Sequence, residues 1–497
     1  MLDACKDRPT TMGKKPRPAA QSDGLLAQYD HDEFFCEMFG RRGLGHTRTI
    51  RDRLNALDIA TLRRRVRDAE RELFNLGITF TVYTEDKAID RILPFDVVPR
   101  VLSPKDWETI ETGVKQRVAA LNLFLHDIYH KEQVIKDGII PEDLVKGNPD
   151  YRPEMCGFDP PQGTYVHICG TDIVRDEKGN LCVLEDNARI PSGVSYVIEN
   201  RHLMMRAFSD LARGMPIANV DEYGSRLTQA LSDVAPAGVS DLTIVLLSPG
   251  VFNSAYFEHV FLAREMGAPL VEGRDLVVEN DKVYMQTTDG LEQVHVIYRR
   301  IDDDFLDPDA FNPDSLLGVP GLFRAYRKGN VTLANAIGTG VADDKAVYAY
   351  MPRIIRYYLG EDPILANVET NICREPEGLA KTLEHLDELV TKPVGEAGGY
   401  GVVIGPRAGK RELSTLRRKL KSDPANFISQ PMIKLSVSPT LIGRTLEPRH
   451  VDLRPFALTG KSTWVLPGGL TRVALKRGSL VVNSSQGGGS KDTWVLV

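Results

Sequence analysis

The sequence predicts an α/β protein with α+β lobes and a helical N-terminal region. Three observations carry this prediction. Apolar residues recur at helical spacing between residues 54 and 76, apolar strands alternate with a helix from residue 242 onward, and short strands flank a glycine-rich loop at residues 390–405. A chain of 497 residues is too long for one ordinary hydrophobic core. We therefore expect two to four domains.

Net charge and cysteine content favour a cytoplasmic protein over a nucleic-acid-binding or membrane protein. The chain has 62 Lys and Arg against 68 Asp and Glu, a net charge of −6. This balance does not favour a surface for nucleic acid or for an anionic membrane. No apolar run approaches the roughly 20 residues of a membrane span. The six cysteines include no C-x-x-C pair and fit reduced thiols, so we expect a cytoplasmic protein.

The first 215 residues are predicted to be mostly helical. Residues 1–24 combine charges of both signs with three prolines and are expected to form a disordered tail. After the helix of residues 54–76, a strand is expected at 78–83. Ser103 then caps a long helix that has Pro104 at its first position. Residues 25–215 are expected to form one region, which also contains a metal-binding hairpin.

Two histidines on the long helix have the spacing of a zinc-binding pair. His126 and His130 lie four residues apart and share one helix face. No third ligand lies nearby in the sequence, and the glutamate of H-E-x-x-H is missing. The pattern therefore favours surface histidines over a metal site.

Residues 165–187 predict a hairpin with a polar patch on one face. Two apolar runs flank the turn residues 176–180. A turn centred between Lys178 and Gly179 would place Asp172 opposite Glu185, with Asn187 on the same face. Opposed carboxylates destabilise a sheet unless a cation lies between them, and Mg²⁺ prefers oxygen ligands. The hairpin therefore predicts a magnesium site, with solvated surface charges as the alternative.

Residues 220–330 are predicted to form a small open α/β domain. A buried strand at 242–247, a helix at 255–266 and a strand at 294–298 follow one another. Ligands are expected beyond the carboxyl ends of such strands, where Ser248, Arg299 and Arg300 lie. These arginines would clamp a substrate carboxylate or, alternatively, pair with the aspartates at 302–304.

Residues 331–497 contain two lysines and a glycine-rich hairpin. Lys345 lies in the first turn of a helix that starts near Asp343, where acidic residues are usual. A helix is expected at 379–389, and Lys392 lies at the mouth of the hairpin that follows. Its glycines would let backbone N–H groups approach an anion, unless this is simply a flexible surface hairpin. A strand is expected at 427–433, and the end of the chain, residues 483–497, is either a flexible tail or, given its apolar last five residues, an ordered segment.

These segments together resemble a known family. Lys392 and Pro393, the glycine hairpin and the strand with its hinge are similar to the nucleotide-binding lobe of ATP-grasp enzymes. Asp172, Glu185-x-Asn187 and the Pro-x-Gly loop after them resemble the metal-binding strands of the same superfamily. Because the metal hairpin comes first here, the chain resembles a circularly permuted ATP-grasp protein related to glutathionylspermidine synthase. Residues 220–330 then resemble a pre-ATP-grasp domain, and 331–497 the nucleotide-binding lobe.

The resemblance implies roles for particular residues. Lys345 and Lys392 would hold the phosphates of ATP, and Asp172, Glu185 and Asn187 would hold Mg²⁺. Arg472 and Arg454, with Lys392, would neutralise charge at the transferring phosphoryl group. The glycine loop would cover the phosphates and the hinge would hold adenine; these residues are Gly398, Gly399, Tyr400 and Gly401 for the loop, and Gln430, Pro431, Met432 and Ile433 for the hinge. Gln430 departs from the acidic residue often found at this hinge.

The activity implied is ATP-dependent ligation of a carboxylate to an amine through an acyl phosphate. The substrates would be a small-molecule or peptide carboxylate and an amine, and ADP and phosphate would be released. A phosphotransferase and a non-catalytic nucleotide-binding scaffold are the alternatives, and the resemblance implies a helical partner protein of the alpha-E type. The complete set of lysines and metal ligands favours the ligase.

Overall fold

The computed structural model describes residues 24–40, 44–75, 77, 79–84, 87–92, 94–394, 401–479, 482 and 488–497. The predicted tail up to residue 23 and the loop residues Gly398, Gly399 and Tyr400 lie outside this part of the chain. None of the helices within it is long and apolar enough to cross a membrane. The N-terminal helices are α1 (Arg48–Asn55) and α2 (Ile59–Asn75), followed by the hairpin of β1 (Thr79–Thr84) and β2 (Lys87–Ile92).

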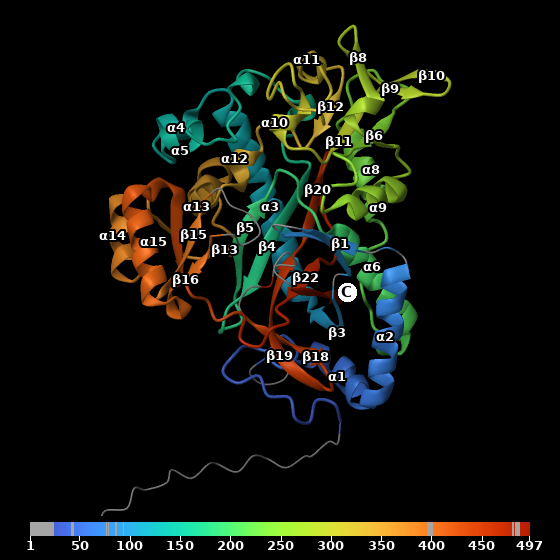
Figure 1. Cartoon of the computed structure of the whole chain (residues 1–497), viewed down its shortest axis with the longest axis vertical. Helices are drawn as coiled ribbons and strands as arrows, with labels where there is room; N and C mark the ends of the chain where they lie inside the picture. The colour runs from blue at the N-terminus through green and yellow to red at the C-terminus, as the bar shows by residue number, and fades with distance from the viewer. Residues whose placement is uncertain are drawn as a thin grey trace, which may run out of the picture.

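A ten-stranded mixed sheet forms the centre of the molecule (Figure 1). Its main path runs in the order β13-β5-β4-β19-β22-β23-β3. Strands from the first half of the chain (β3, β4 and β5) and from the second half therefore lie interleaved in one sheet. The strands are β3 (Phe95–Leu102), β4 (Ile168–Arg175), β5 (Leu181–Asn187), β13 (Ala366–Asn367), β18 (Val437–Ile442), β19 (Thr445–Arg454), β20 (Phe456–Thr459), β21 (Thr463–Val465), β22 (Leu470–Val473) and β23 (Gly489–Val495).

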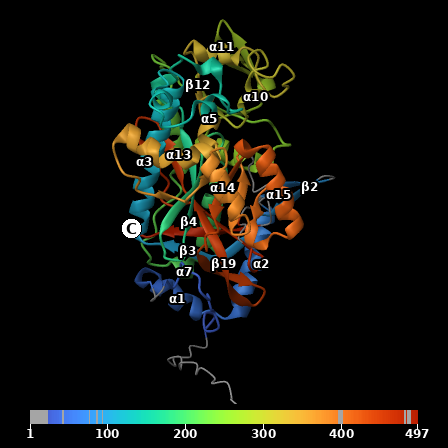
Figure 2. The same ribbon diagram turned by 90° about the vertical axis from the view of Figure 1, so that its left-hand side faces the viewer.

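Helices cover both faces of this sheet. Neighbouring residues on one strand contribute to different hydrophobic clusters: Val495 packs in the cluster of α3 (Pro104–Ile128), and Trp494 packs in that of α6 (Val194–Ala207). This is the alternation expected of strands buried on both faces. Ser103 caps α3 as predicted, with its side chain accepting from the Asp106 amide at 3.1 Å. Figure 2 shows α3 and α13 (Lys345–Leu359) on the same side of the molecule.

The end of the chain is a buried strand, so the flexible-tail alternative is wrong for residues 489–495. β23 pairs with β22 on one side and, in parallel, with β3 on the other. Lys491 and Asp492 are buried there. Lys491 bonds to Asp96, and Asp492 accepts from Arg201 at 2.9 Å. These internal pairs explain how two charged residues fit inside a sheet.

The middle of the chain forms the predicted small open α/β unit. Its parallel sheet has the order β12-β11-β6-β7. A three-stranded antiparallel meander is added to it, in which β10 was not predicted. The elements are α7 (Ser209–Ala212), α8 (Tyr223–Asp233), β6 (Ile244–Leu247), α9 (Tyr256–Met266), β7 (Leu270–Val271), β8 (Leu276–Glu279), β9 (Lys282–Thr287), β10 (Gly290–Val294), β11 (Val296–Arg299), α10 (Asp303–Leu306), α11 (Leu322–Arg327) and β12 (Thr332–Ala334).

A four-stranded antiparallel sheet, β14-β17-β15-β16, forms a separate lobe beside α14 and α15 (Figure 1). The predicted helix 379–389 begins and ends earlier, because Pro376 starts it and Leu389 already belongs to β15. The remaining elements are α4 (Gln133–Lys136), α5 (Glu142–Lys146), α12 (Gly340–Asp343), β14 (Asn371–Ile372), α14 (Pro376–Glu384), β15 (Leu389–Pro393), β16 (Val403–Ile404), α15 (Lys410–Ser422) and β17 (Phe427–Pro431).

Candidate functional site

A cleft of about 910 Å³ lies between the ten-stranded sheet and the four-stranded lobe. It brings together side chains from segments that are far apart in the sequence. Six of the predicted site residues line it: Glu185, Asn187, Arg300, Lys345, Arg454 and Arg472. Its volume lies within the range of small-molecule sites.

The predicted hairpin is present and carries the predicted pairing. Asp172 pairs with Glu185, and Gly170 pairs with Asn187. The turn itself is centred on Lys178, because Arg175 pairs with Leu181. A shift of register next to Asp172 restores the predicted alignment at the functional end of the hairpin.

Two arginines neutralise Asp172. Arg454 donates from Nε to Oδ1 at 2.5 Å and from Nη2 to Oδ2 at 2.8 Å, and Arg472 Nη2 donates to Oδ2 at 2.6 Å. Burial alone would raise the pKa of Asp172, but the two guanidiniums hold it well below its usual value. The cations beside Asp172 are therefore guanidiniums, whereas the sequence had indicated only a metal ion there. Asp452, also missed, accepts from Arg472 Nε at 3.0 Å and fixes that side chain.

Glu185 and Asn187 offer oxygen ligands to the cleft. Burial and the neighbouring Asp172 raise the pKa of Glu185, and Lys345 and Arg454 oppose the rise. Glu185 forms an ion pair with Arg454, whose Nη2 lies 3.9 Å from Oε1. Asn187 donates from its amide to Gly170 O at 3.0 Å, which leaves the amide oxygen for another partner. A carboxylate with incomplete charge compensation beside an amide oxygen fits a divalent cation.

The two predicted lysines lie close enough to influence each other. Lys392 donates to Gln430 Oε1 at 2.6 Å. Burial, reinforced by the charge of Lys345, lowers the pKa of Lys392 to about 8, although Glu185 and Asp172 oppose this. Lys345 is the first residue of α13, and Asp344 caps that helix by accepting from Ala346 N at 2.7 Å. Two cations from different elements thus lie near Glu185 on β5.

The glycine-rich hairpin and the hinge are placed only in part. Val390 pairs with Ile404, which confirms the hairpin, and Gly401 has φ +71° as its tight bend requires. Gln430 bonds to Lys392 and to Thr370, at 2.9 Å, so its side chain is already engaged. The other hinge residues do not line the cleft: Pro431 is exposed, whereas Met432 and Ile433 line a second hollow of about 1220 Å³.

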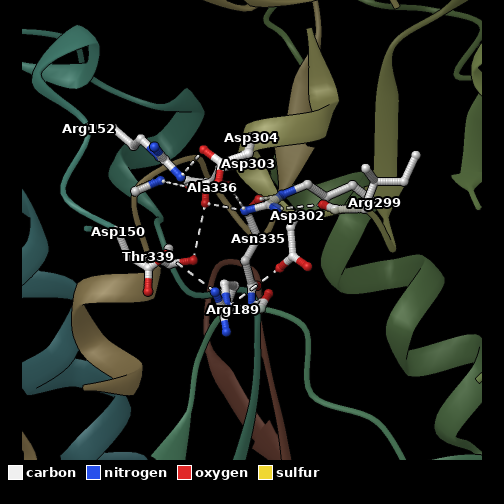
Figure 3. Close-up of polar contacts among 12 residues, drawn as sticks. Asp150, Arg152, Arg189, Arg299, Asp302, Asp303, Asp304, Asn335, Ala336 and Thr339 are labelled. Carbon is white, nitrogen blue, oxygen red and sulfur yellow. Dashed lines mark hydrogen bonds and ion pairs between the residues drawn. The ribbon is translucent and has the colours of Figure 1, made fainter. Parts of the chain in front are cut away.

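The substrate-binding candidates at the small parallel sheet bind the protein itself. Arg299 donates to Asn335 O at 2.8 Å and Ala336 O at 2.9 Å, and it pairs with Asp303 at 2.7 Å (Figure 3). Pairing with the aspartates, the alternative weighed for these arginines, is therefore correct for Arg299. Its buried donors are used internally, which argues against a substrate clamp.

Arg300 and Ser248 are also committed to internal bonds. Arg300 borders the cleft but pairs with the buried Glu258 at 3.0 Å and donates to Pro191 O at 2.7 Å. Ser248 is fully buried, and its hydroxyl lies 2.9 Å from His259 Nδ1. Their place at the strand ends was predicted. The bond of Arg300 to Pro191 holds the loop after β5, whereas Ser248 bonds to His259, and neither arrangement points to substrate.

Three residues that hold this loop were not identified from the sequence. The Asn335 side chain accepts from His167 N and donates to Ala188 O, at 2.7 and 2.8 Å, so it joins the start of β4 to the end of β5. Glu258 accepts from Gly193 N at 2.7 Å. Asp343 accepts from Arg189 N at 3.0 Å, and burial raises the pKa of Asp343 to about 7. No local motif marks these residues, because each holds the loop through a bond to a residue that is remote in sequence.

One arginine at the cleft is surrounded by carboxylates. Arg189 follows β5, and Figure 3 shows it between Asp150 and Asp302. Its nitrogen atoms lie 3.3 Å from Asp150, and 3.6 Å from both Asp302 and Asp343. Three acidic groups around one guanidinium leave this end of the cleft acidic.

Comparison with known proteins agrees with this arrangement. The sequence profile of circularly permuted ATP-grasp type 2 proteins matches residues 99–474. An uncharacterized protein of Synechocystis sp. is 51% identical over 95% of this chain and 98% of its own length. A Frankia casuarinae protein, provisionally named glutamate–cysteine ligase 2-2, is 43% identical over 90% of this chain, which spans 52% of that protein.

A solved structure has the same fold. The glutathione synthetase-like effector of Globodera pallida superposes with a TM-score of 0.58 at 12% identity, over 88% of this chain and 98% of the effector. At this identity the likeness concerns the fold alone. The extent of the profile match, however, establishes the family: this chain is a member of the circularly permuted ATP-grasp type 2 family.

Proposed function

We propose that this protein is an ATP-dependent ligase that joins a carboxylate to an amine. The observation that carries the proposal is that Lys345 and Lys392 both lie close enough to Glu185 to interact with its charge, and that Lys345 and Glu185 line the same cleft. Burial and the charge of Lys345 lower the pKa of Lys392 to about 8, so a bound anion would favour the charged form of Lys392. A triphosphate with its divalent cation supplies charges of both signs that match the lysines and Glu185.

The chemistry proposed for the cleft needs charge neutralisation and positioning. A carboxylate oxygen of the acyl substrate attacks the γ-phosphorus of ATP, and the bond to the β-phosphate oxygen breaks to release ADP. The amine then attacks the carbonyl carbon of the acyl phosphate, phosphate leaves, and the nitrogen loses a proton. Lys345 and Lys392 would bind the phosphates, while Arg454 and Arg472, held by Asp172 and Asp452, would lie beside the developing charge.

The magnesium site is assigned to the edge of β5. Glu185 and Asn187 would hold the ion, because their oxygens line the cleft. Asp172 would act mainly by fixing the arginines, since guanidiniums occupy both its oxygens. Bound Mg²⁺ would neutralise phosphate charge and orient the triphosphate.

The relatives support the reaction class but not the substrates. The Frankia protein carries the name of a ligase for two amino acids, and this chain corresponds to about half of it. The acidic surroundings of Arg189 suit an amine better than a second carboxylate. We therefore propose an amine acceptor at that end of the cleft and leave the acyl donor open.

Removal of the carboxylate of Glu185 tests the proposal. Glu185→Ala should lower Mg²⁺-dependent ATP turnover on the order of 100-fold or more, because it removes the charged metal ligand and leaves the two lysines less compensated. The secondary structure, measured by circular dichroism, should be unchanged. Glu177→Ala, in the turn of the same hairpin, is the matched control and should retain turnover. Turnover that survives in Glu185→Ala would overturn the metal assignment.

Product analysis separates the ligase from a phosphotransferase. ATP turnover should be screened over amino acids, peptides and polyamines, and the products analysed for an amide together with ADP and phosphate. A phosphorylated product without an amide would support the phosphotransferase instead. Parallel reactions with an alpha-E type helical protein test whether such a partner is required.

A further inference from the structure

A second group of polar side chains lies outside the cleft, at the end of α3. His126 belongs to the last turn of this helix, His130 follows it, and Asp159 lies in the loop that leads to β4. Within the described residues, these three side chains form a set whose ligand atoms all lie within 4.8 Å of one another. The fold thus supplies the third ligand that the sequence analysis did not find near the histidine pair.

The distances in this group match the coordination of a small metal ion. Oδ1 of Asp159 lies 3.3 Å from His126 Nε2 and 3.2 Å from His130 Nε2. Zn²⁺ binds imidazole nitrogen and carboxylate oxygen at about 2.0–2.2 Å, so two ligand atoms of a tetrahedral shell lie roughly 3.3 Å apart. The two distances to Asp159 therefore match two edges of a tetrahedral site, and the ligand atoms of the two histidines lie within 4.8 Å of each other.

The hydrogen bonding of His130 determines which nitrogen is available. Its Nδ1 lies 2.8 Å from the carbonyl oxygen of His126, and because a carbonyl only accepts, Nδ1 carries the proton. Nε2 of a neutral ring then has a lone pair that faces the Asp159 carboxylate. This Nε2 is buried and has no hydrogen-bond partner among the described residues. A backbone acceptor on one ring nitrogen with the other left for a ligand is the usual state of a metal-binding histidine.

The lone pair of His130 and the carboxylate of Asp159 repel each other, and protonation of both histidine rings would not remove the repulsion within this group. The imidazoles of His126 and His130 are stacked, with centroids 4.3 Å apart and planes only 9° from parallel. Two imidazolium ions at this distance would repel each other. If only His126 is protonated, His130 still directs a lone pair toward the carboxylate, because its proton is on Nδ1. A single cation among the three ligand atoms satisfies all of them.

We propose that His126, His130 and Asp159 bind one transition-metal ion of the Zn²⁺ class, with water completing the shell. Imidazole ligands favour Zn²⁺, Ni²⁺ and Cu²⁺ over Mg²⁺, so this site differs in chemistry from the cleft. The ion joins the end of α3 to the loop before β4, where the Gly157 amide already donates to Tyr129 O at 2.8 Å. Its role is to fix that loop, and it is independent of the proposed ligase activity.

Titration of the metal-free full-length chain with Zn²⁺ tests this site. The protein is stripped with a chelator and titrated by calorimetry in buffer that contains Mg²⁺, so that the oxygen ligands of the cleft are occupied. One Zn²⁺ should bind per chain. His130→Ala and Asp159→Asn should each weaken binding by about 10- to 100-fold or more. Substitution of Asp159, whose side chain is 70% exposed, should leave the fold intact.

Two matched controls distinguish this site from adventitious binding. His202 pairs with Asp221 at 3.0 Å on the surface and belongs to no three-ligand set among the described residues, so His202→Ala should not affect Zn²⁺ binding. Glu185→Gln should also retain it, which separates this site from the cleft. The visible spectrum of bound Co²⁺ should show the intense bands of a tetrahedral shell.

Three results would overturn the proposal. These are the absence of stoichiometric Zn²⁺ binding, unchanged affinity in His130→Ala, and unchanged affinity in Asp159→Asn. The last result would show a surface histidine pair that binds metal without the carboxylate.

Discussion

At the scale of single residues, Lys392 shows how burial prepares a group for its ligand. Its ammonium donates to Gln430 Oε1 and lies near a second cation, Lys345. Burial and this cation lower the pKa of Lys392 to about 8. A bound polyanion would reverse the effect, because it favours the charged form. A polyanion bound beside Lys392 should therefore restore its full positive charge.

This argument predicts a pH dependence for nucleotide binding. Below about pH 8, Lys392 is charged in the free protein and ATP binds without proton uptake. Above that pH, binding must first protonate Lys392, so the Kd for a non-hydrolysable ATP analogue should rise, by up to about tenfold per pH unit. The measurement is calorimetric titration with the analogue between about pH 7 and about pH 9.

Lys392→Met and Lys392→Arg provide the controls. The methionine variant should bind weakly at every pH, and the arginine variant, which stays charged, should show no rise in Kd over the same range. A rise of equal steepness in Lys392→Met would show that another group titrates, and the assignment of Lys392 would be wrong.

Single residues also show which parts of the site could be predicted from the sequence. Glu185, Asn187 and Lys392 were identified because each belongs to a short pattern with its own chemistry. The partners of Asp172 were not, since Arg454 and Arg472 are 282 and 300 residues away. For the same reason, the sequence predicted Mg²⁺ as the cation beside Asp172, whereas two arginines neutralise that carboxylate. For Arg299 the sequence left two alternatives open, a substrate clamp and pairing with the nearby aspartates, because its bonds to Asn335 O and Ala336 O come from a loop that is remote in sequence.

At the scale of elements, β23 shows how the end of the chain is held. Lys491 bonds to Asp96 and to Val98 O, at 3.2 Å, on β3, and to Pro439 O, at 2.9 Å, on β18. Burial lowers the pKa of Lys491, and Asp96 opposes this. One buried ammonium thus links three strands. The apolar last residues indicated order here, but the pairing with β3 lies nearly 400 residues away and has no local signal.

The buried pair predicts a large cost when one partner is removed. Lys491→Met should lower the free energy of unfolding by about 3–5 kcal/mol, because Asp96 would remain charged and buried. Lys434→Met, which removes an exposed ion pair with Glu33, is the matched control and should cost about 0–1 kcal/mol. Urea unfolding followed by circular dichroism measures both.

A double variant tests the cause of that loss. In Lys491→Met/Asp96→Asn the unpaired charge is gone, so part of the stability should return. If the double variant is as unstable as Lys491→Met, the loss comes from packing and not from charge.

At the scale of the whole molecule, the ten-stranded sheet explains why a permuted order of segments is tolerated. β4 and β5 from the first half lie between β13 and β19 from the second half. The sheet depends on which strands meet and not on where the chain starts. The order of the motifs was readable from the sequence, but the arrangement of strands within the sheet was not, because β19 reaches β4 across about 280 positions.

The cleft between two sheets predicts that nucleotide stabilises both of them. A ligand that binds only the folded state adds about 2.7 kcal/mol of stability at a concentration 100 times its Kd. Because Lys392 lies on β15 and Glu185 on β5, this stabilisation should reach both sheets. An ATP analogue with Mg²⁺ should therefore slow amide hydrogen exchange in β15 and β17 as well as in β4 and β5, as measured by mass spectrometry.

Adenosine is the control for this experiment, since it has no phosphates to reach the lysines and should protect β4 and β5 little. The variant Lys345→Met, which lacks one of the two facing cations, should reduce protection in both sheets together, because a bound triphosphate connects them. Protection confined to the four-stranded lobe, with unchanged exchange in β4 and β5, would mean that the nucleotide contacts one sheet only. The cleft would then bind something other than the triphosphate, and the ligase proposal would lose its structural basis.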